Sequence, residues 1–290
     1  MKTSKTVILL SILIVFFAMA QSATGLFMTG GSGPFEFATL RGETVLMNGM
    51  GLYAMDTFFK APILRGTDAL TLFVCVPLLI IALVIYRRGT MRRKLFLTGI
   101  LSFFLYNSTS VVTGVAYNDL FLLYIVYFSA SLFAFILAVR SIDLKALSAS
   151  VSPRLPRKGI AILLFVAAAA LLFAWLGDIL TPLITGSLPK IASYTTEVTY
   201  AVDLGIIAPL CIIAGTMLLR RKDAGYLLAP ILLIMLAIVG LMVSLQTFFQ
   251  LSAGIALSPG ELIGKAGSFM ILAAISIWFI VRFFKSVEEQ

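Results

Sequence analysis

The sequence predicts an all-α fold, a polytopic membrane bundle of eight transmembrane helices, from three observations. First, 60% of the 290 residues are hydrophobic and only 12% are charged, whereas soluble domains are about 45–50% apolar and about 25% charged. Second, the apolar residues gather in runs of about 20, the length that crosses a bilayer core of about 30 Å. Third, these runs are continuous and do not alternate as barrel strands do. The spans are therefore helices.

Eight runs meet the length requirement, and each is a candidate span. They are Val7–Phe27, Ala69–Tyr86, Leu95–Ala116, Leu120–Val139, Ile160–Leu176, Tyr200–Leu219, Tyr226–Phe249 and Ile263–Val281.

The first run has a second interpretation. Lys2 and Lys5 precede an apolar stretch that ends in Ala18-Met19-Ala20, an arrangement typical of a cleaved signal peptide. Cleavage would leave seven helices, and retention gives eight. We expect retention because the apolar run continues to Phe27.

The loop charges predict the orientation. With the N-terminus inside, the inner segments hold 17 of the 22 basic residues and the outer segments hold nine of the 13 acidic ones. Lys and Arg concentrate in short cytoplasmic loops, so we expect a plasma or inner membrane protein with a cytoplasmic C-terminus. The same charges predict contact with the lipid bilayer and not with nucleic acid, because they are spread over separate short loops.

Residue types that are absent or isolated exclude several kinds of chemistry. The chain has no histidine, which rules out His-ligated haem, His zinc sites and His-dependent triads. Cys75 and Cys211 stand alone, so no CxxC motif exists. We therefore expect no metal and no cofactor. An enzyme is the less favoured class, although carboxylates alone can act as acid and base.

An internal duplication is one interpretation of the single membrane domain 1–290. The double arginines at Arg87 and Arg220 lie 133 residues apart, and Pro77 and Pro209 fall in the helices that precede them. Two four-helix units, 1–149 and 150–290, would then share one orientation. The alternative is that any two pairs of hairpins with positive inner loops look alike.

Two long outer segments, 21–67 and 177–199, join the predicted spans. The first contains Leu46–Phe59, which is too apolar to stay in water. The favoured interpretation is an interfacial helix on the bilayer or over the bundle. The alternative is a methionine-rich lid over an outward cavity.

Asp203 is the leading candidate for a binding residue. The run from Leu204 to Leu219 has only 16 residues, about 24 Å of helix, so a full span draws Asp203 and Tyr200 about one turn below the surface. A carboxylate at that depth should face other helices and find a partner. Glu197 lies close by. Asp68, by contrast, directly precedes its apolar run, where the helix dipole would favour it.

Polar side chains at helical spacing complete the candidate site. Tyr106 and Asn107 belong to such a stripe on the third span, and Gln246 and Thr247 to one on the seventh. One interpretation is hydrogen bonding between helices, worth roughly 0.6 kcal/mol each. The other is a polar, outward-facing cavity lined by the third, fourth, sixth and seventh spans.

Three functions remain open. The first is a transporter or solute-binding protein for a small cationic or protonatable solute. The second is a non-catalytic subunit or assembly factor that contacts a membrane protein partner. The third is a carboxylate-dependent membrane enzyme. A transporter should show broken helices or a cavity, and a subunit should show a polar stripe facing lipid.

Overall fold

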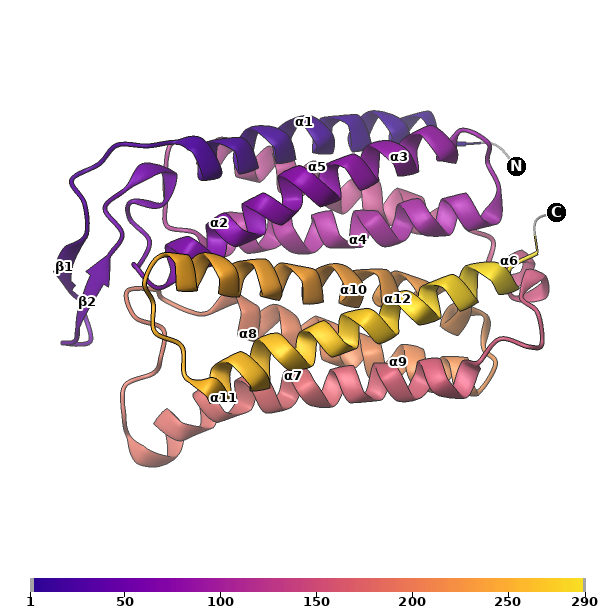
Figure 1. Ribbon diagram of the computed structural model, residues 1–290. Coiled ribbons are helices and arrows are strands. Elements are labelled where there is room, and N and C mark those ends of the chain that lie inside the picture. Colours follow the sequence, from indigo (N-terminus) through magenta and orange to yellow (C-terminus); the bar gives the residue numbers. More distant parts are fainter. Residues whose placement is uncertain (1–2, 289–290) are drawn as a thin grey trace.

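A computed structural model describes residues 3–288 and shows a bundle of long helices lying side by side (Figure 1). Eight helices in this described part are long and apolar enough to cross a membrane, and they confirm all eight predicted spans. They are Lys5–Phe27 (α1), Lys60–Tyr86 (α2, Lys60–Leu70, and α3, Val76–Tyr86), Met91–Gly114 (α4), Phe121–Arg140 (α5), Arg157–Thr185 (α7), Val198–Leu219 (α8, Val198–Val202, and α9, Ala208–Leu219), Asp223–Ser252 (α10) and Leu262–Ser286, which contains α12 (Ser268–Ser286) and follows the short α11 (Pro259–Glu261).

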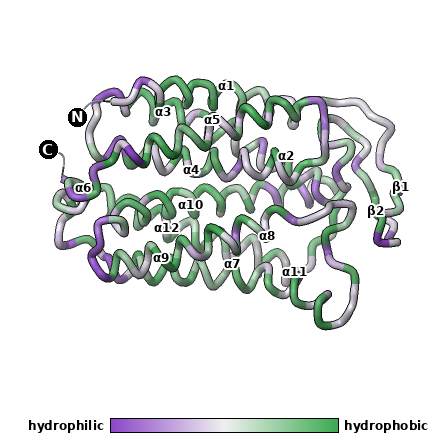
Figure 2. Tube along the Cα trace, turned by 180° about the vertical axis from the view of Figure 1, so that it is seen from behind, coloured by the Kyte–Doolittle hydropathy of each residue, from purple (hydrophilic) through white to green (hydrophobic). Residues whose placement is uncertain are grey.

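The distribution of its apolar residues indicates that the chain is a multi-pass membrane protein. Figure 2 shows hydrophobic residues along the helix shafts and hydrophilic residues mainly at the two ends of the bundle. The outward faces carry large apolar side chains, among them Phe16, Phe73, Val84, Leu122 and Ile162. Such faces are stable against lipid and not against water.

The two ends of the bundle differ. Both termini lie at one end, together with the short helix α6 (Leu144–Ser150) that joins α5 to α7 (Figure 1). A β-hairpin and the loop 186–197 lie at the other end, which we call the hairpin end. α4 and α10 are the most buried spans, and α10 packs against α2, α4, α9 and α12. The helices form two groups, α1–α5 and α7–α12. The core therefore runs between these two groups of helices.

Two spans are longer than predicted, which shortens the loops. The second begins at Lys60 rather than Ala69, and α7 continues to Thr185. Asp68 is therefore two turns inside a helix, and its expected place at a helix N-terminus is wrong. The early turns of α2 tolerate Asp68 because one face of this helix packs on protein, while Arg65 is exposed.

The connection 28–59 forms a β-hairpin and not the expected interfacial helix. Strands β1 (Phe35–Ala38) and β2 (Thr44–Met47) pair antiparallel with Phe35 opposite Met47. A short 3₁₀ helix, Gly51–Tyr53, follows. Gly49 and Gly51 have φ of 65° and 60°, a left-handed conformation that glycine adopts readily and that interrupts a helix.

Three spans contain π-helical segments, two of which stand in similar settings. Thr71–Cys75 separates α2 from α3, Asp203–Ile207 separates α8 from α9, and Leu262–Gly267 precedes α12. Pro77 and Pro209 each follow their π segment by two residues. Proline removes a backbone donor and its ring crowds the preceding turn, so the helix widens there. The shared feature fits the two-unit interpretation, which stays a prediction.

A cavity with two buried carboxylates

A cavity of about 1140 Å³ lies at the hairpin end, between the two groups of helices. Its described wall is formed by residues of α2, α4, α7, α8, α10 and α12, with Asp203, β2, the segments 53–59 and 255–257, and the loop 186–197. All eight candidate residues of the sequence analysis border it: Asp68, Tyr106, Asn107, Glu197, Tyr200, Asp203, Gln246 and Thr247.

The helices that line the cavity differ in part from those expected. The fourth span, α5, places no residue on the described wall, whereas the second and fifth spans do. The α5 tyrosines are buried in the bundle: Asn107 donates to Tyr127 Oη at 3.1 Å, and Asn118 donates to Tyr124 Oη at 3.1 Å. These two polar groups on α5 therefore serve helix packing.

The Asp203 centre joins three helices. The carboxyl group is 6% exposed, and it accepts a hydrogen bond from Trp175 Nε1 on α7 at 2.9 Å and one from the Tyr106 hydroxyl on α4 at 3.2 Å. The Trp175 ring lies against that of Tyr200, with centroids 5.3 Å apart and the ring planes tilted by 41°. Both donors are neutral, and no ion pair to Asp203 occurs among the side chains that the structure describes. The negative charge at this point of the wall lacks a counter-ion in the described chain.

The Asp68 centre is more enclosed. Asp68 is 2% exposed, accepts from Gln21 Nε2 on α1 at 2.5 Å, and accepts from the Tyr53 hydroxyl at 2.7 Å. Gln21 Nε2 also donates to Tyr53 Oη at 3.1 Å. Burial and the neighbouring carboxylate raise the pKa of Tyr53, so its hydroxyl stays a neutral donor. A Cβ at Gly25 would stand 1.9 Å from Asp68 Oδ2, so only glycine fits beside this carboxyl.

Polar groups of α10 hold the start of α2 in place. Gln246 Nε2 donates to Thr67 Oγ1 at 2.8 Å, and Gln250 Nε2 donates to the Phe59 carbonyl at 3.4 Å. A Cβ at Gly66 would lie 2.6 Å from Gln246 Cα, so the two helix backbones nearly touch. Gln246 therefore positions α2 as well as bordering the cavity.

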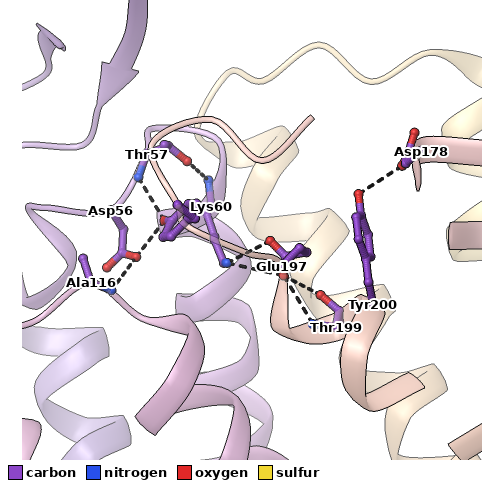
Figure 3. A network of polar contacts seen from close by, with 9 residues as sticks. Asp56, Thr57, Lys60, Ala116, Asp178, Glu197, Thr199 and Tyr200 are labelled. Atoms are coloured by element: carbon purple, nitrogen blue, oxygen red, sulfur yellow. Dashed lines mark hydrogen bonds and ion pairs between the residues drawn. The ribbon is translucent and has the colours of Figure 1, made fainter. Parts of the chain in front are cut away.

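A polar network connects the segments that lead into α2 and α8 (Figure 3). Lys60 Nζ lies 3.1 Å from Glu197 Oε2 and 3.9 Å from the centre of the Tyr194 ring. Glu197 also accepts from the Thr199 N–H and so caps α8. The Tyr194 hydroxyl donates to Asp56 Oδ1 at 2.7 Å. The two groups of helices are thus linked over the cavity.

Asp56 is a third buried acid, and it lies outside the spans. Burial raises the pKa of its carboxyl, while hydrogen bonds from Tyr194 and the Ala116 N–H and the charge of Lys60 act in the opposite direction. Its second oxygen has no partner within the described residues. Burial is the largest of these effects because the carboxyl has lost most of its contact with water.

The charges on the described wall are unequal. Two basic residues border the cavity, and both are paired: Lys60 with Glu197, and Lys190 with Asp178 at 3.1 Å. Five acidic residues border it, namely Glu43, Asp68, Asp178, Glu197 and Asp203. Aromatic rings are also frequent there, namely those of Tyr53, Phe58, Phe59, Tyr106, Phe173, Trp175, Tyr194, Tyr200 and Phe269. The cavity therefore combines excess negative charge with aromatic surface.

Several residues of the site were not found from the sequence. Gln21 has a visible signal, because it is an amide within a long apolar run. Trp175 stands at the end of the predicted fifth run, and the sequence does not reveal which way its side chain points. Tyr53, Lys60 and Tyr194 come from segments without helical periodicity, so no sequence pattern places them near an acid.

No protein family model, curated protein or solved structure matches the chain. The fold and the site define a class, an eight-span membrane protein with an acidic, aromatic cavity at one end. Its function is therefore argued from this geometry.

Proposed function

We propose that the protein binds a small organic cation or protonatable amine in the cavity and transports it across the membrane. The observation that carries the proposal is the environment of the Asp203 carboxyl, which borders a large cavity. The carboxyl accepts hydrogen bonds from two neutral donors and has no counter-ion among the described side chains.

The surroundings of Asp203 suit an ammonium group. A cation gains from the carboxylate and also from the faces of aromatic rings within about 6 Å. Trp175 contacts both the carboxyl and the Tyr200 ring, and Tyr106 contacts the carboxyl from α4. Ionisable groups inside a membrane commonly mark a substrate or ion path. A π-helical segment begins at Asp203, and such segments are frequent at functional sites.

The direction of the polar side chains favours transport or solute binding over a subunit role. Tyr106, Asn107, Gln246 and Thr247 border the cavity, whereas the outward faces of the spans carry mainly Leu, Ile, Phe and Val. A subunit that recognises its partner through polar contacts would expose such groups to lipid.

The test uses tryptophan fluorescence. The chain has two tryptophans, so W278F leaves Trp175 as the single reporter, and it touches Asp203. Trp278 itself is half exposed on the outward face of α12. Purified protein in lipid nanodiscs is titrated with benzyltrimethylammonium, with benzyl alcohol as the neutral control and benzoate as the anionic control.

We expect saturable quenching by the cation alone. D203N should weaken binding at least about tenfold, which corresponds to about 1.4 kcal/mol. D119N is the matched control, since Asp119 is exposed and lies away from the cavity. Equal responses to all three compounds, or no effect of D203N, would contradict cation binding. Binding without uptake into proteoliposomes would contradict transport.

A further inference from the structure

A second feature of the cavity has no part in amine recognition as proposed. Asp68 borders the same cavity from α2 but is packed among side chains of α1 and the segment before α2. Both donors to Asp203, Tyr106 and Trp175, line the cavity, whereas of the two donors to Asp68 only Tyr53 does. The Asp68 carboxyl is therefore less well placed than Asp203 to receive a whole organic ligand, but it can still take up a proton.

The groups that donate hydrogen bonds to Asp68 are neutral, and Arg65 acts on it only through its positive charge. Gln21 from α1 and Tyr53 from the 3₁₀ helix donate to it. Tyr124 and Tyr127 of α5 lie near enough to interact with its charge. Arg65 is three residues away on α2, but its guanidinium donates to the Leu26 carbonyl at 3.3 Å and forms no ion pair with Asp68. An ionised carboxylate in a membrane span without a counter-ion is costly, so the neutral, protonated form is favoured.

The hydrogen bonds allow a proton to enter and leave without movement of the backbone. In the ionised form Tyr53 donates to Asp68 Oδ2. In the protonated form the new O–H can donate to the Tyr53 oxygen, and the tyrosine hydrogen turns away, because a hydroxyl both donates and accepts. Tyr53 also borders the cavity. Asp68 borders it as well, so a proton that leaves this pair has a short path to the cavity.

We propose that Asp68 is a proton-binding site coupled to the cation site at Asp203, so that entry of an organic cation releases the Asp68 proton into the cavity. This proposal rests on the proposed function. The cation's positive charge lowers the free energy of the Asp68 carboxylate, and by linkage a proton on Asp68 must weaken cation binding equally. The balance is simple: an O–H bond breaks at Asp68 and the proton passes to water.

The first experiment does not depend on any ligand. Infrared spectroscopy in H₂O and D₂O records the carbonyl stretch of protonated carboxyl groups in nanodiscs near neutral pH. We expect a band that is lost in D68N and kept in D203N and D119N. If D68N has the same spectrum as the parent protein, the proton-binding site is refuted.

A second variant keeps the experiment decisive if D68N does not fold. Y53F leaves the acid in place and removes one of its two hydrogen-bond donors. The protonated-carboxyl band should then persist at a shifted frequency. An unshifted band in a folded Y53F protein would show that the band does not arise from Asp68.

The second experiment measures coupling. Benzyltrimethylammonium is added to weakly buffered protein that contains a pH-sensitive dye. We expect release of about one proton for each cation bound, and no release in D68N although cation binding remains. Cation binding without proton release from the parent protein would refute the coupling but not the proposed function. An Asp68 band without any cation binding would refute the proposed function but not the proton-binding site.

Discussion

Asp68 and Asp203 accept hydrogen bonds from similar donors but are enclosed to different degrees. Each accepts one tyrosine hydroxyl and one N–H donor, and the N–H comes from the first helix of its own half: Gln21 on α1 or Trp175 on α7. Each also lies within three residues of the start of a π-helical segment. The shared construction shows how a bundle can hold an acid in a span with neutral donors alone.

The difference lies in what stands between each carboxyl and the cavity. Asp68 has Gly25 against one oxygen and the Tyr53 hydroxyl against the same atom. Both donors to Asp203 belong to the cavity wall, whereas Gln21, one of the two donors to Asp68, does not. The comparison teaches that the two roles proposed above, proton binding at Asp68 and cation binding at Asp203, depend on how the donors are packed and not on their chemistry.

The largest effect should come from filling the space beside Asp68. In Gly25→Ala the new methyl would stand 1.9 Å from Asp68 Oδ2 and 2.8 Å from Tyr53 Oη, so the buried trio must shift. Overpacking of this kind costs about 1–3 kcal/mol. Thermal unfolding in detergent should show a clearly lower midpoint.

Gly177→Ala is the control on the Asp203 side, because its new methyl would meet nothing within 4 Å. Alanine favours a helix over glycine by about 1 kcal/mol, so this variant should be equal to the parent protein or more stable. Equal losses in the two variants would mean that the cost of Gly25→Ala does not come from crowding at Asp68.

Removal of the tyrosine hydroxyls should have the next largest effect. Tyr53→Phe leaves a fully enclosed carboxyl with one donor fewer, and such a loss costs about 1–3 kcal/mol. Tyr106→Phe removes a longer bond of 3.2 Å beside the cavity, where water can replace the hydroxyl, so we expect about 0.5–1 kcal/mol. The unfolding midpoints of the two variants test this order. The reverse order would contradict the conclusion that Asp68 is more enclosed than Asp203.

The ion pair between the two helix starts should contribute less. Glu197→Gln removes the partner of Lys60, and both side chains are about one-sixth exposed, at 16% and 14%. We expect a loss of about 1 kcal/mol or less. Asp178→Asn is the matched control, since its partner Lys190 is 76% exposed, and it should cost less still. A larger effect of Asp178→Asn would place the important contact elsewhere.

The smallest effect should be a pH dependence from Asp56. Burial raises the pKa of this carboxyl from 3.8, so the folded chain keeps the proton to a higher pH than the unfolded chain. Its contribution to stability is therefore greatest at acid pH and falls as the pH rises through that window. Asp56→Asn should lack this fall, which unfolding midpoints from pH 4 to pH 7 would show. Parallel curves for the two proteins would contradict it.

Hydrophobic periodicity and span length predicted a large part of this molecule. The eight spans follow from apolar runs alone, and Asp203 follows from a run too short to cross the bilayer. The start of α2 was missed because Lys60, Arg65 and Asp68 lower its hydropathy. Asp68 is buried because α2 packs against α1 and α10, and no local pattern reveals these contacts.

The parts that could not be predicted are the ones that loops supply. Tyr53 and Tyr194 reach buried acids from segments whose course is set by glycine turns and tertiary contacts. The β-hairpin had a weak signal in Phe35 and Phe37, which alternate, and in Gly42 at the turn. The prediction that α5 lines the cavity was wrong because its tyrosines accept hydrogen bonds from α4 and from the loop between α4 and α5.

The π-helical segment at Asp203–Ile207 makes the chain sensitive to length by a single residue. One residue turns an α-helix by about 100°, so deletion of Gly205 would convert the wide turn to an ordinary one and rotate Asp203 away from its tryptophan and tyrosine donors. The apolar span would remain almost unchanged in length and hydropathy. A single-codon loss could thus abolish the binding centre in a protein that still inserts and folds, and such a change would escape any comparison based on hydrophobicity alone.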